Sequence, residues 1–148
     1  MGTVLVGYGD DSYDHEGYPA QVLDDGTITG TYSNETRPRM IGQVVAACGC
    51  GWTGTTRYPC PEPFDEHAEA LALAEWESVH ARPVLDRRQS ERWDRLERLL
   101  AGAGDRLAHR TARLGREDVL ERTLRDLATA TDLARELQRS EREQGADR

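Results

Sequence analysis

The chain has 148 residues, of which 37% are hydrophobic and only 6% aromatic, and its formal net charge is −8. This length fits one domain or a small module with a helical extension, and so few aromatic residues limit the size of its core. The acidic balance, with 19 basic and 27 acidic residues, excludes a protein that coats nucleic acid over its whole surface.

The first residues and the cysteine count bear on the cellular compartment. Residues 1–11 lack the basic segment and the long apolar run of a secretory signal, and no stretch approaches the roughly 18 apolar residues that cross a bilayer. We therefore predict a cytoplasmic protein that has no membrane partner. Three cysteines, an odd number in a reducing compartment, argue against a disulfide framework.

The first 60 residues are predicted to form a small antiparallel sheet. Residues 3–7 are expected as its first strand. In VLDDGTIT, Asp25-Gly26 separates two β-like runs, which is a strong signal for a hairpin. Residues 40–47, MIGQVVAA, are expected as a further strand that leads into the cysteines.

An acidic stretch, GDDSYDHEG, lies between the first two predicted strands. It places Asp10, Ser12, Asp14 and Glu16 at alternate positions, as the start of a calcium loop does. His15 stands where such a loop requires glycine, so we interpret the stretch as a solvated turn.

Residues 65–80 are predicted to form a helix. Asp65 can cap its N-terminus, acidic residues favour its first turn, and Pro83 is expected to end it. Leu73, Trp76 and His80 follow one another at spacings of three and four, so their side chains share one face.

From residue 86 onward the apolar residues recur at helical spacing in two runs. Gly115 separates the runs and suits the C-terminus of a helix, while Gly102 and Gly104 are expected to weaken or kink the first helix. An antiparallel hairpin of two helices fits this pattern, and a coiled-coil dimer fits it equally well. The two stripes consist of Trp93, Leu96, Leu100, Ala103, Leu107 and Leu114, and of Val119, Leu120, Leu124, Leu127, Ala130, Leu133, Ala134 and Leu137.

Charge differs between these two predicted helices. Residues 87–116 hold nine arginines and four acidic residues, whereas residues 117–148 hold six arginines and nine acidic residues. The simplest interpretation is a set of ion pairs between a basic and an acidic helix. The alternative is a nucleic-acid face, although no helix-turn-helix signature or interleaved aromatic residues support it. That face would consist of Arg88, Arg92, Arg95, Arg106 and Arg113.

All three cysteines lie in the stretch ACGCGWTGTTRYPC, residues 47–60. Thiolates bind zinc, and a structural zinc site takes four ligands from Cys and His. Gly49 permits the tight turn that a Cys48-Gly49-Cys50 pair needs, and Trp52 could cover the ion. Small cysteines buried at the end of a strand are the competing interpretation.

The histidines narrow the choice of further ligands. His67 and His80 are thirteen residues apart, which places them ~20 Å apart along one helix, so they cannot bind the same ion. His80 shares the face of Trp76 and pairs more naturally with the first two cysteines than with Cys60. We predict Cys48, Cys50 and His80 as metal ligands, Cys60 or His67 as alternatives for the remaining position, and Trp52 and Trp76 as shielding residues.

Two motifs carry a resemblance to a known group. CGCGWTGTTRYP followed by EWESVHARPVL resembles small uncharacterised actinobacterial proteins that carry CxCGW and a helix ending in WxxxHxxP. The match covers roughly residues 44–85. It implies no activity, but it points to Cys48, Cys50, Trp52, Trp76, His80 and Pro83.

Together these patterns predict an α+β protein. Residues 1–85 are expected to form a β-rich, zinc-stabilised module that includes the 65–80 helix, and residues 86–148 a helical hairpin or coiled-coil extension. Loss of the metal should unfold the module and spare the hairpin.

The chain lacks a phosphate-binding glycine loop, a lysine for a Walker motif and a GxSxG elbow. We therefore predict no catalytic residues and a non-catalytic interaction or regulatory protein. Its helices would bind a protein partner or a second copy of the chain. Binding of nucleic acid, and a zinc enzyme with an open coordination position, are the alternatives.

Overall fold

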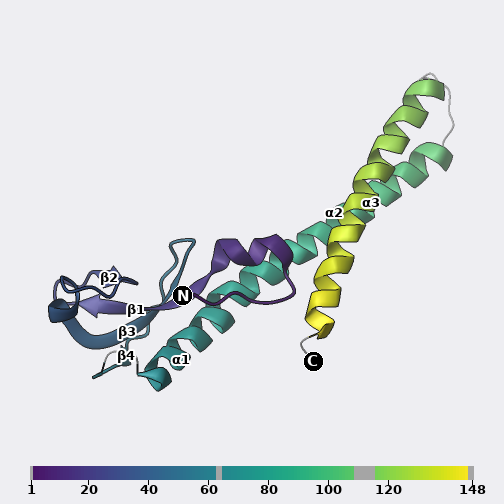
Figure 1. The fold of residues 1–148 in the computed structure, drawn as a ribbon. Helices are drawn as coiled ribbons and strands as arrows, with labels where there is room; N and C mark the ends of the chain where they lie inside the picture. Colours follow the sequence, from purple (N-terminus) through teal and green to yellow (C-terminus); the bar gives the residue numbers. More distant parts are fainter. Residues whose placement is uncertain (1, 63–64, 109–115, 147–148) are drawn as a thin grey trace. The chain divides into compact units, whose positions relative to one another are not determined.

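The computed structural model describes residues 2–62, 65–108 and 116–146 of the chain (Figure 1). These residues form a four-stranded antiparallel sheet followed by long helices, which confirms the predicted α+β class. They divide into two compact units. The sheet unit comprises Met1–Leu5 and Asp10–Leu85, and the helical unit comprises Val6–Gly9 and Asp86–Arg148.

The sheet has the strand order β2-β1-β3-β4, with β1 at Gly17–Leu23, β2 at Ile28–Thr29, β3 at Met40–Cys48 and β4 at Tyr58–Pro59. The strand predicted at residues 40–47 is therefore confirmed. Side chains alternate between the two faces of β1 and β3. One face forms a small buried cluster of Ala20, Val22, Val45 and Ala47 with Tyr18 at its edge.

The strand predicted at residues 3–7 is wrong. Only Thr3 forms a bridge, with Gly17, and the chain then turns at Gly7, whose φ is 93°. The Gly7 carbonyl accepts a hydrogen bond from Gln144 Nε2 at 3.0 Å. Apart from the Thr3 bridge, residues 3–7 therefore do not extend the sheet.

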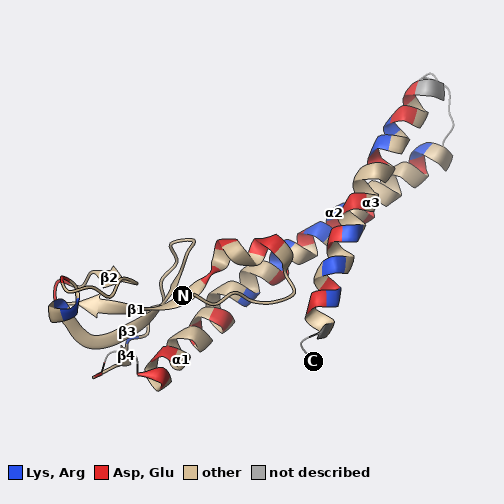
Figure 2. Cartoon of the chain, viewed as in Figure 1, with Lys and Arg blue, Asp and Glu red and all other residues tan. Residues whose placement is uncertain are grey.

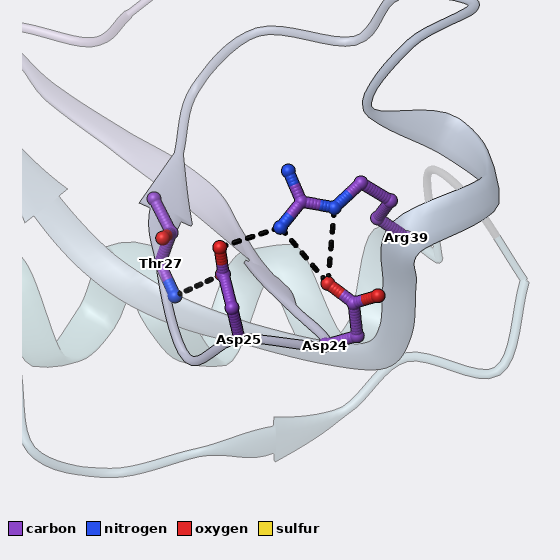
Figure 3. A network of polar contacts seen from close by, with 4 residues as sticks. All are labelled: Asp24, Asp25, Thr27 and Arg39. Atoms are coloured by element: carbon purple, nitrogen blue, oxygen red, sulfur yellow. Dashed lines mark hydrogen bonds and ion pairs between the residues drawn. The ribbon is translucent and has the colours of Figure 1, made fainter.

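The hairpin predicted at Asp25-Gly26 is confirmed, and an ion pair reinforces it (Figure 3). Gly26 occupies the left-handed conformation with a φ of 82°. Asp25 accepts a hydrogen bond from the Thr27 amide at 2.9 Å, and Arg39 reaches both Asp24 and Asp25. Hydrogen bonds from Thr27, which have the larger effect, and from Arg39 lower the pKa of Asp25 to about 2.

The stretch interpreted as a solvated turn is a 3-10 helix, η1, at Gly9–His15. Its Ser12 and His15 side chains are buried. Tyr13 and Asp14, which lie between them, are exposed. Ser12 and His15 are three residues apart, so they share one face of this short amphipathic helix.

The helix predicted at residues 65–80 begins as expected and continues past its expected end. Asp65 caps α1 (Glu66–Glu75) by accepting from the amides of His67 and Ala68. A π-helical turn, η3 (Trp76–Ala81), follows and leads directly into α2 (Arg82–Ala108). The prediction that Pro83 ends the helix is therefore wrong.

The π turn explains how the helix passes Pro83. Proline donates no backbone hydrogen bond, and its ring clashes with the carbonyl four residues earlier in a regular helix. Here the Arg82 amide bonds the carbonyl of Glu77, five residues back. The wider turn just before the proline relieves the crowding, as π bulges do.

The helical unit pairs α2 with α3 (Arg116–Ala146). Leu96 of α2 packs with Leu133 and Leu137 of α3, and Arg106, further along α2, bonds Asp126, earlier in α3. The two helices are therefore antiparallel, as predicted. α2 runs without a break through Gly102 and Gly104, and Leu114 and Gly115 lie outside the described residues.

Only part of each predicted apolar stripe is buried in this contact. Leu96, Ala103, Ala130, Leu133 and Leu137 are buried, and Thr123 and Ser140 continue the buried row of α3. Six other members of the stripes remain 37–66% exposed, because two helices cover only one narrow seam of each other. These are Trp93, Leu100, Leu107, Leu120, Leu124 and Leu127.

Charged residues of both signs alternate along α2 and α3 (Figure 2). None of the described helices is both long and apolar enough to span a bilayer.

Candidate metal centre

Four side chains with metal-binding atoms converge within the sheet unit. They are His15, Cys48, Cys50 and His80, and their ligand atoms all lie within 4.8 Å of one another. The residues come from η1, from the end of β3 and its following turn, and from the π turn η3. Three separate segments of the chain thus meet at one point.

Strand pairing brings His15 to the cysteines. Gly17, at the start of β1, pairs with Cys48, at the end of β3, and the Gly49 amide bonds the carbonyl of Glu16 at 2.8 Å. His15 immediately precedes this pairing, so its ring lies beside the end of β3. Its Nδ1 is 3.8 Å from Cys48 Sγ.

A tight turn holds the two cysteines together. The Gly51 amide bonds the Cys48 carbonyl at 2.9 Å, and the Cys48 amide bonds the carbonyl of Trp52 at 2.9 Å. Gly51 has a φ of 93°, the left-handed conformation that closes a three-residue hairpin loop. The glycine that makes the CxC turn feasible is therefore Gly51, although the sequence favoured Gly49 for this role.

The π turn supplies the second histidine. His80 Nε2 lies 3.1 Å from Cys50 Sγ and 3.3 Å from His15 Nδ1. Trp52 stacks on the His80 ring at 4.6 Å between centroids, with an interplanar angle of 4°. The turn after β3 therefore contributes both a ligand atom and the aromatic ring that fixes the orientation of His80.

These distances agree with a tetrahedral zinc ion. Bonds of ~2.3 Å to sulfur and ~2.0 Å to nitrogen, at tetrahedral angles, separate neighbouring ligand atoms by about 3.3–3.8 Å. The three measured distances, 3.1, 3.3 and 3.8 Å, fall in or next to this range. Two thiolates and two imidazoles form a ligand set of structural zinc sites.

The protonation states of His80 and Cys48 determine how readily they can bind a cation. Burial, which has the larger effect, and the neighbouring His15 lower the pKa of His80. Its imidazole is therefore neutral and can coordinate a metal ion. Burial, with the neighbouring Cys50 adding to it, raises the pKa of Cys48 and keeps the metal-free thiol protonated. Metal binding would displace that proton, because the thiolate is the ligand.

Trp76 is buried and lines the site. Its Nε1 donor is buried and has no acceptor at hydrogen-bonding geometry within the described residues. The same side chain favours the thiolate form of Cys48. A metal-bound thiolate would supply an acceptor for this indole, and such outer contacts commonly orient metal ligands.

Gly17 leaves space for the Trp76 ring. A Cβ atom built on Gly17 would lie 2.1 Å from Trp76 Cδ2, far inside van der Waals contact. The β1 residue that pairs with Cys48 must therefore lack a side chain.

The structure brings together three predicted ligands, Cys48, Cys50 and His80, and places both predicted shielding tryptophans against them. The two alternative ligands lie elsewhere. Cys60 is buried and its thiol donates to the Glu62 carbonyl at 3.1 Å, while His67 is exposed in the first turn of α1. Neither belongs to the cluster.

Sequence reasoning missed His15 as a ligand. The residue was considered only as the wrong occupant of a calcium loop, and no local spacing connects it to a CxC pair 33 positions later. The pairing of GYPAQVL with MIGQVVAAC was the available signal. An antiparallel register that pairs Gly17 with Cys48 also brings His15, two residues before Gly17, close to the cysteine thiols.

The arginines of the alternative nucleic-acid face do not form one exposed row. Arg88 and Arg92 are half-buried and make contacts, and Arg106 is bonded to Asp126. Arg95 is exposed, and Arg113 lies outside the described residues.

No family model, no curated protein and no solved structure matches the chain.

Proposed function

We propose that the chain is a non-catalytic binding protein whose sheet unit folds around one zinc ion. His15, Cys48, Cys50 and His80 would be the four ligands. The observation that carries this proposal is the convergence of their four ligand atoms within 4.8 Å, from three separate segments. Zinc is favoured among divalent metals because two thiolates and two imidazoles suit its tetrahedral coordination.

A structural role follows from the number of ligands. Catalytic zinc sites keep one position open for water or substrate, whereas four protein ligands fill a tetrahedron. Of the four residues only Cys50 is exposed, and Trp52 covers the adjacent His80. These features argue against the alternative of a zinc enzyme.

The sheet unit also needs such an ion. Two of its four strands have only two residues each, and one of its buried clusters joins two alanines with two valines. A metal that joins η1, β3 and η3 would tie these short elements to the core that contains Trp76 and Leu85, and so add to the stability that side-chain packing supplies.

Metal analysis of the full-length chain, purified without chelator, tests the proposal. We expect one zinc per chain in the wild type. We expect loss of zinc in His15→Ala, Cys48→Ser, Cys50→Ser and His80→Ala. Cobalt substitution should give the intense visible absorption of a tetrahedral thiolate site.

Cys60→Ser and His67→Ala are the matched controls, because they remove the same chemical groups outside the cluster. Both should retain one zinc per chain. A metal-free wild type, or loss of zinc from a control with retention in His15→Ala, would overturn the assignment.

The helical unit is the proposed interaction surface. Its two long helices leave large apolar side chains exposed, and exposed apolar patches of this kind mark binding sites. The nucleic-acid alternative predicts duplex binding that weakens steeply with salt. We expect no duplex binding even at low salt.

A further inference from the structure

The helical unit carries an apolar face that its own two helices leave uncovered. Trp93, Leu100 and Leu107 recur every seven residues along α2, and each is between 41% and 48% exposed. Leu120, Leu124 and Leu127 occupy α3 at spacings of four and three, and each is between 37% and 66% exposed. We refer to these six side chains as the apolar face.

All six lie on the same side of the helix pair. At ~100° per residue, the α2 residues are rotated from the buried seam by about 50° and the α3 residues by a quarter turn or more, in the same sense on both helices. Because α2 and α3 run in opposite directions, the same sense of rotation leads to the same side. The six residues therefore lie on one side of the pair.

The position of each residue along the pair follows from an observed contact. Arg106 bonds Asp126, which sets these two residues level with each other. Leu107 is then level with Leu124, and Glu97 is level with Arg135. Glu97 and Arg135 are both exposed at the outer edges of the apolar face, one on each helix.

Charge at the edges of this face indicates its occupant. Glu97 at the α2 edge is acidic, Arg135 at the α3 edge is basic, and the two residues are level with each other. A face with one acidic and one basic edge is complementary to itself after a twofold rotation about an axis parallel to the helices.

We propose that the apolar face binds the same face of a second copy of the chain. Each α2 then lies antiparallel on the α3 of the other copy, and four helices enclose one core. Leu107 meets Leu124 of the other copy, and Glu97 of each copy faces Arg135 of the other at the edge. The opposite arrangement, α2 on α2, would place like charges together.

The full-length, zinc-replete chain tests this inference by sedimentation equilibrium over a wide range of concentrations. We expect a dimer of twice the 16.6 kDa chain mass. Leu124→Glu should weaken dimerisation on the order of a hundredfold, because it places a charge against Leu107 of the other copy. Circular dichroism should show unchanged helix content, because Leu124 lies outside the buried seam.

Leu71→Glu is the matched control. Leu71 is also a partly exposed leucine on a helix, α1, but it is not part of the apolar face. This variant should remain as dimeric as the wild type. A wild type that is monomeric at every concentration overturns the proposal, as does a Leu124→Glu variant that still forms dimers.

A charge exchange tests the arrangement of the four helices. Glu97→Arg and Arg135→Glu should each weaken the dimer by about two- to fivefold, the usual range for exposed ion pairs, and the double exchange should restore it. A double variant weaker than either single variant would overturn the packing of α2 on α3.

The metal site and the apolar face share no residues, so the two proposals fail separately. His80→Ala should lose zinc and retain dimerisation, whereas Leu124→Glu should lose dimerisation and retain zinc.

Discussion

The sheet unit and the helical unit differ in how their segments are held together. In the sheet unit, two strands have only two residues each, Trp76 and Leu85 are buried among smaller side chains, and four potential metal ligands from three segments converge. In the helical unit, long helices bury a seam of leucines and alanines, with no cysteine or histidine in α2 or α3. Under the proposed function, a metal would join the segments of the sheet unit, whereas apolar packing joins the two helices.

The two units also differ in how well they tolerate substitutions. The sheet unit depends on single positions, such as Gly17 and Gly51, that fix close contacts around the site. The helical unit depends on a repeated apolar pattern, in which each residue contributes only a small part of the stability. A single substitution should therefore cost more in the sheet unit than in the helical unit.

Metal removal should give the largest effect and would separate the two units. A strong chelator should unfold the sheet unit, because structural zinc sites of small domains contribute about 10–16 kcal/mol of apparent binding free energy, as much as a whole domain's stability. The backbone amides of the helical unit should remain protected from hydrogen exchange. Hydrogen exchange followed peptide by peptide would show this, with fast exchange in β1 and β3 and slow exchange in the α2–α3 seam.

Re-addition of zinc to the chelated chain should restore protection in β1 and β3. Equal loss of protection in both units would contradict the comparison, and so would unchanged exchange in the sheet unit after complete removal of the metal.

Gly17→Ala should give the next effect. The added Cβ would lie 2.1 Å from the Trp76 ring, and overpacking of this kind typically costs 1–3 kcal/mol, about the range expected here. The variant should unfold at lower denaturant concentration, and its zinc affinity should fall because Trp76 lines the site. Tryptophan fluorescence and zinc titration would measure the two quantities.

Gly104→Ala in α2 is the matched change in the helical unit. A Cβ at this position meets no atom within 4 Å, and alanine favours a helix over glycine by up to about 1 kcal/mol. This variant should be slightly more stable than the wild type. Destabilisation of similar size by both substitutions would show that the two units do not differ in tolerance.

Asp25→Asn should give the smallest effect, and it is the one that depends on pH. The folded pKa of Asp25 is about 2, below the ordinary value of 3.8. Its ionised form therefore stabilises the hairpin above pH 4, and this contribution is lost as the pH falls through 2. Asp25 is exposed, so the difference in midpoint between wild type and variant should be small at pH 7 and vanish below pH 2.

Acid titration of both proteins, followed by urea unfolding at each pH, would check the sign. A difference that grows toward low pH would contradict the role of the carboxylate in the network of Figure 3.

Local patterns in the sequence predicted the local elements well. Asp65 marks the start of α1, Asp25-Gly26 marks a hairpin, and heptad-like spacing marks the helical pair, because each of these depends on residues within a few positions. Pro83 misled the prediction, since the relief of its clash depends on a π turn that has no simple sequence signature.

Non-local contacts were harder to predict. Cys48, Cys50 and His80 could be grouped because a CxC turn and a helix face each leave a local trace. His15 joins them only through the register of β1 on β3, which no short motif encodes. The extent of burial of the two stripes could not be predicted for a similar reason, because spacing shows which residues are apolar but not how wide a seam the neighbouring helix covers.

The unequal exposure of the four site residues has a kinetic consequence. His15 and Cys48 are buried, whereas Cys50 is exposed on its turn. Because Cys50 is the exposed member of the four, competing thiols and chelators would reach a bound ion most readily on its side, and this sulfur would be the first ligand to dissociate. The lifetime of the bound metal would then be set by one accessible bond, even though its affinity depends on all four.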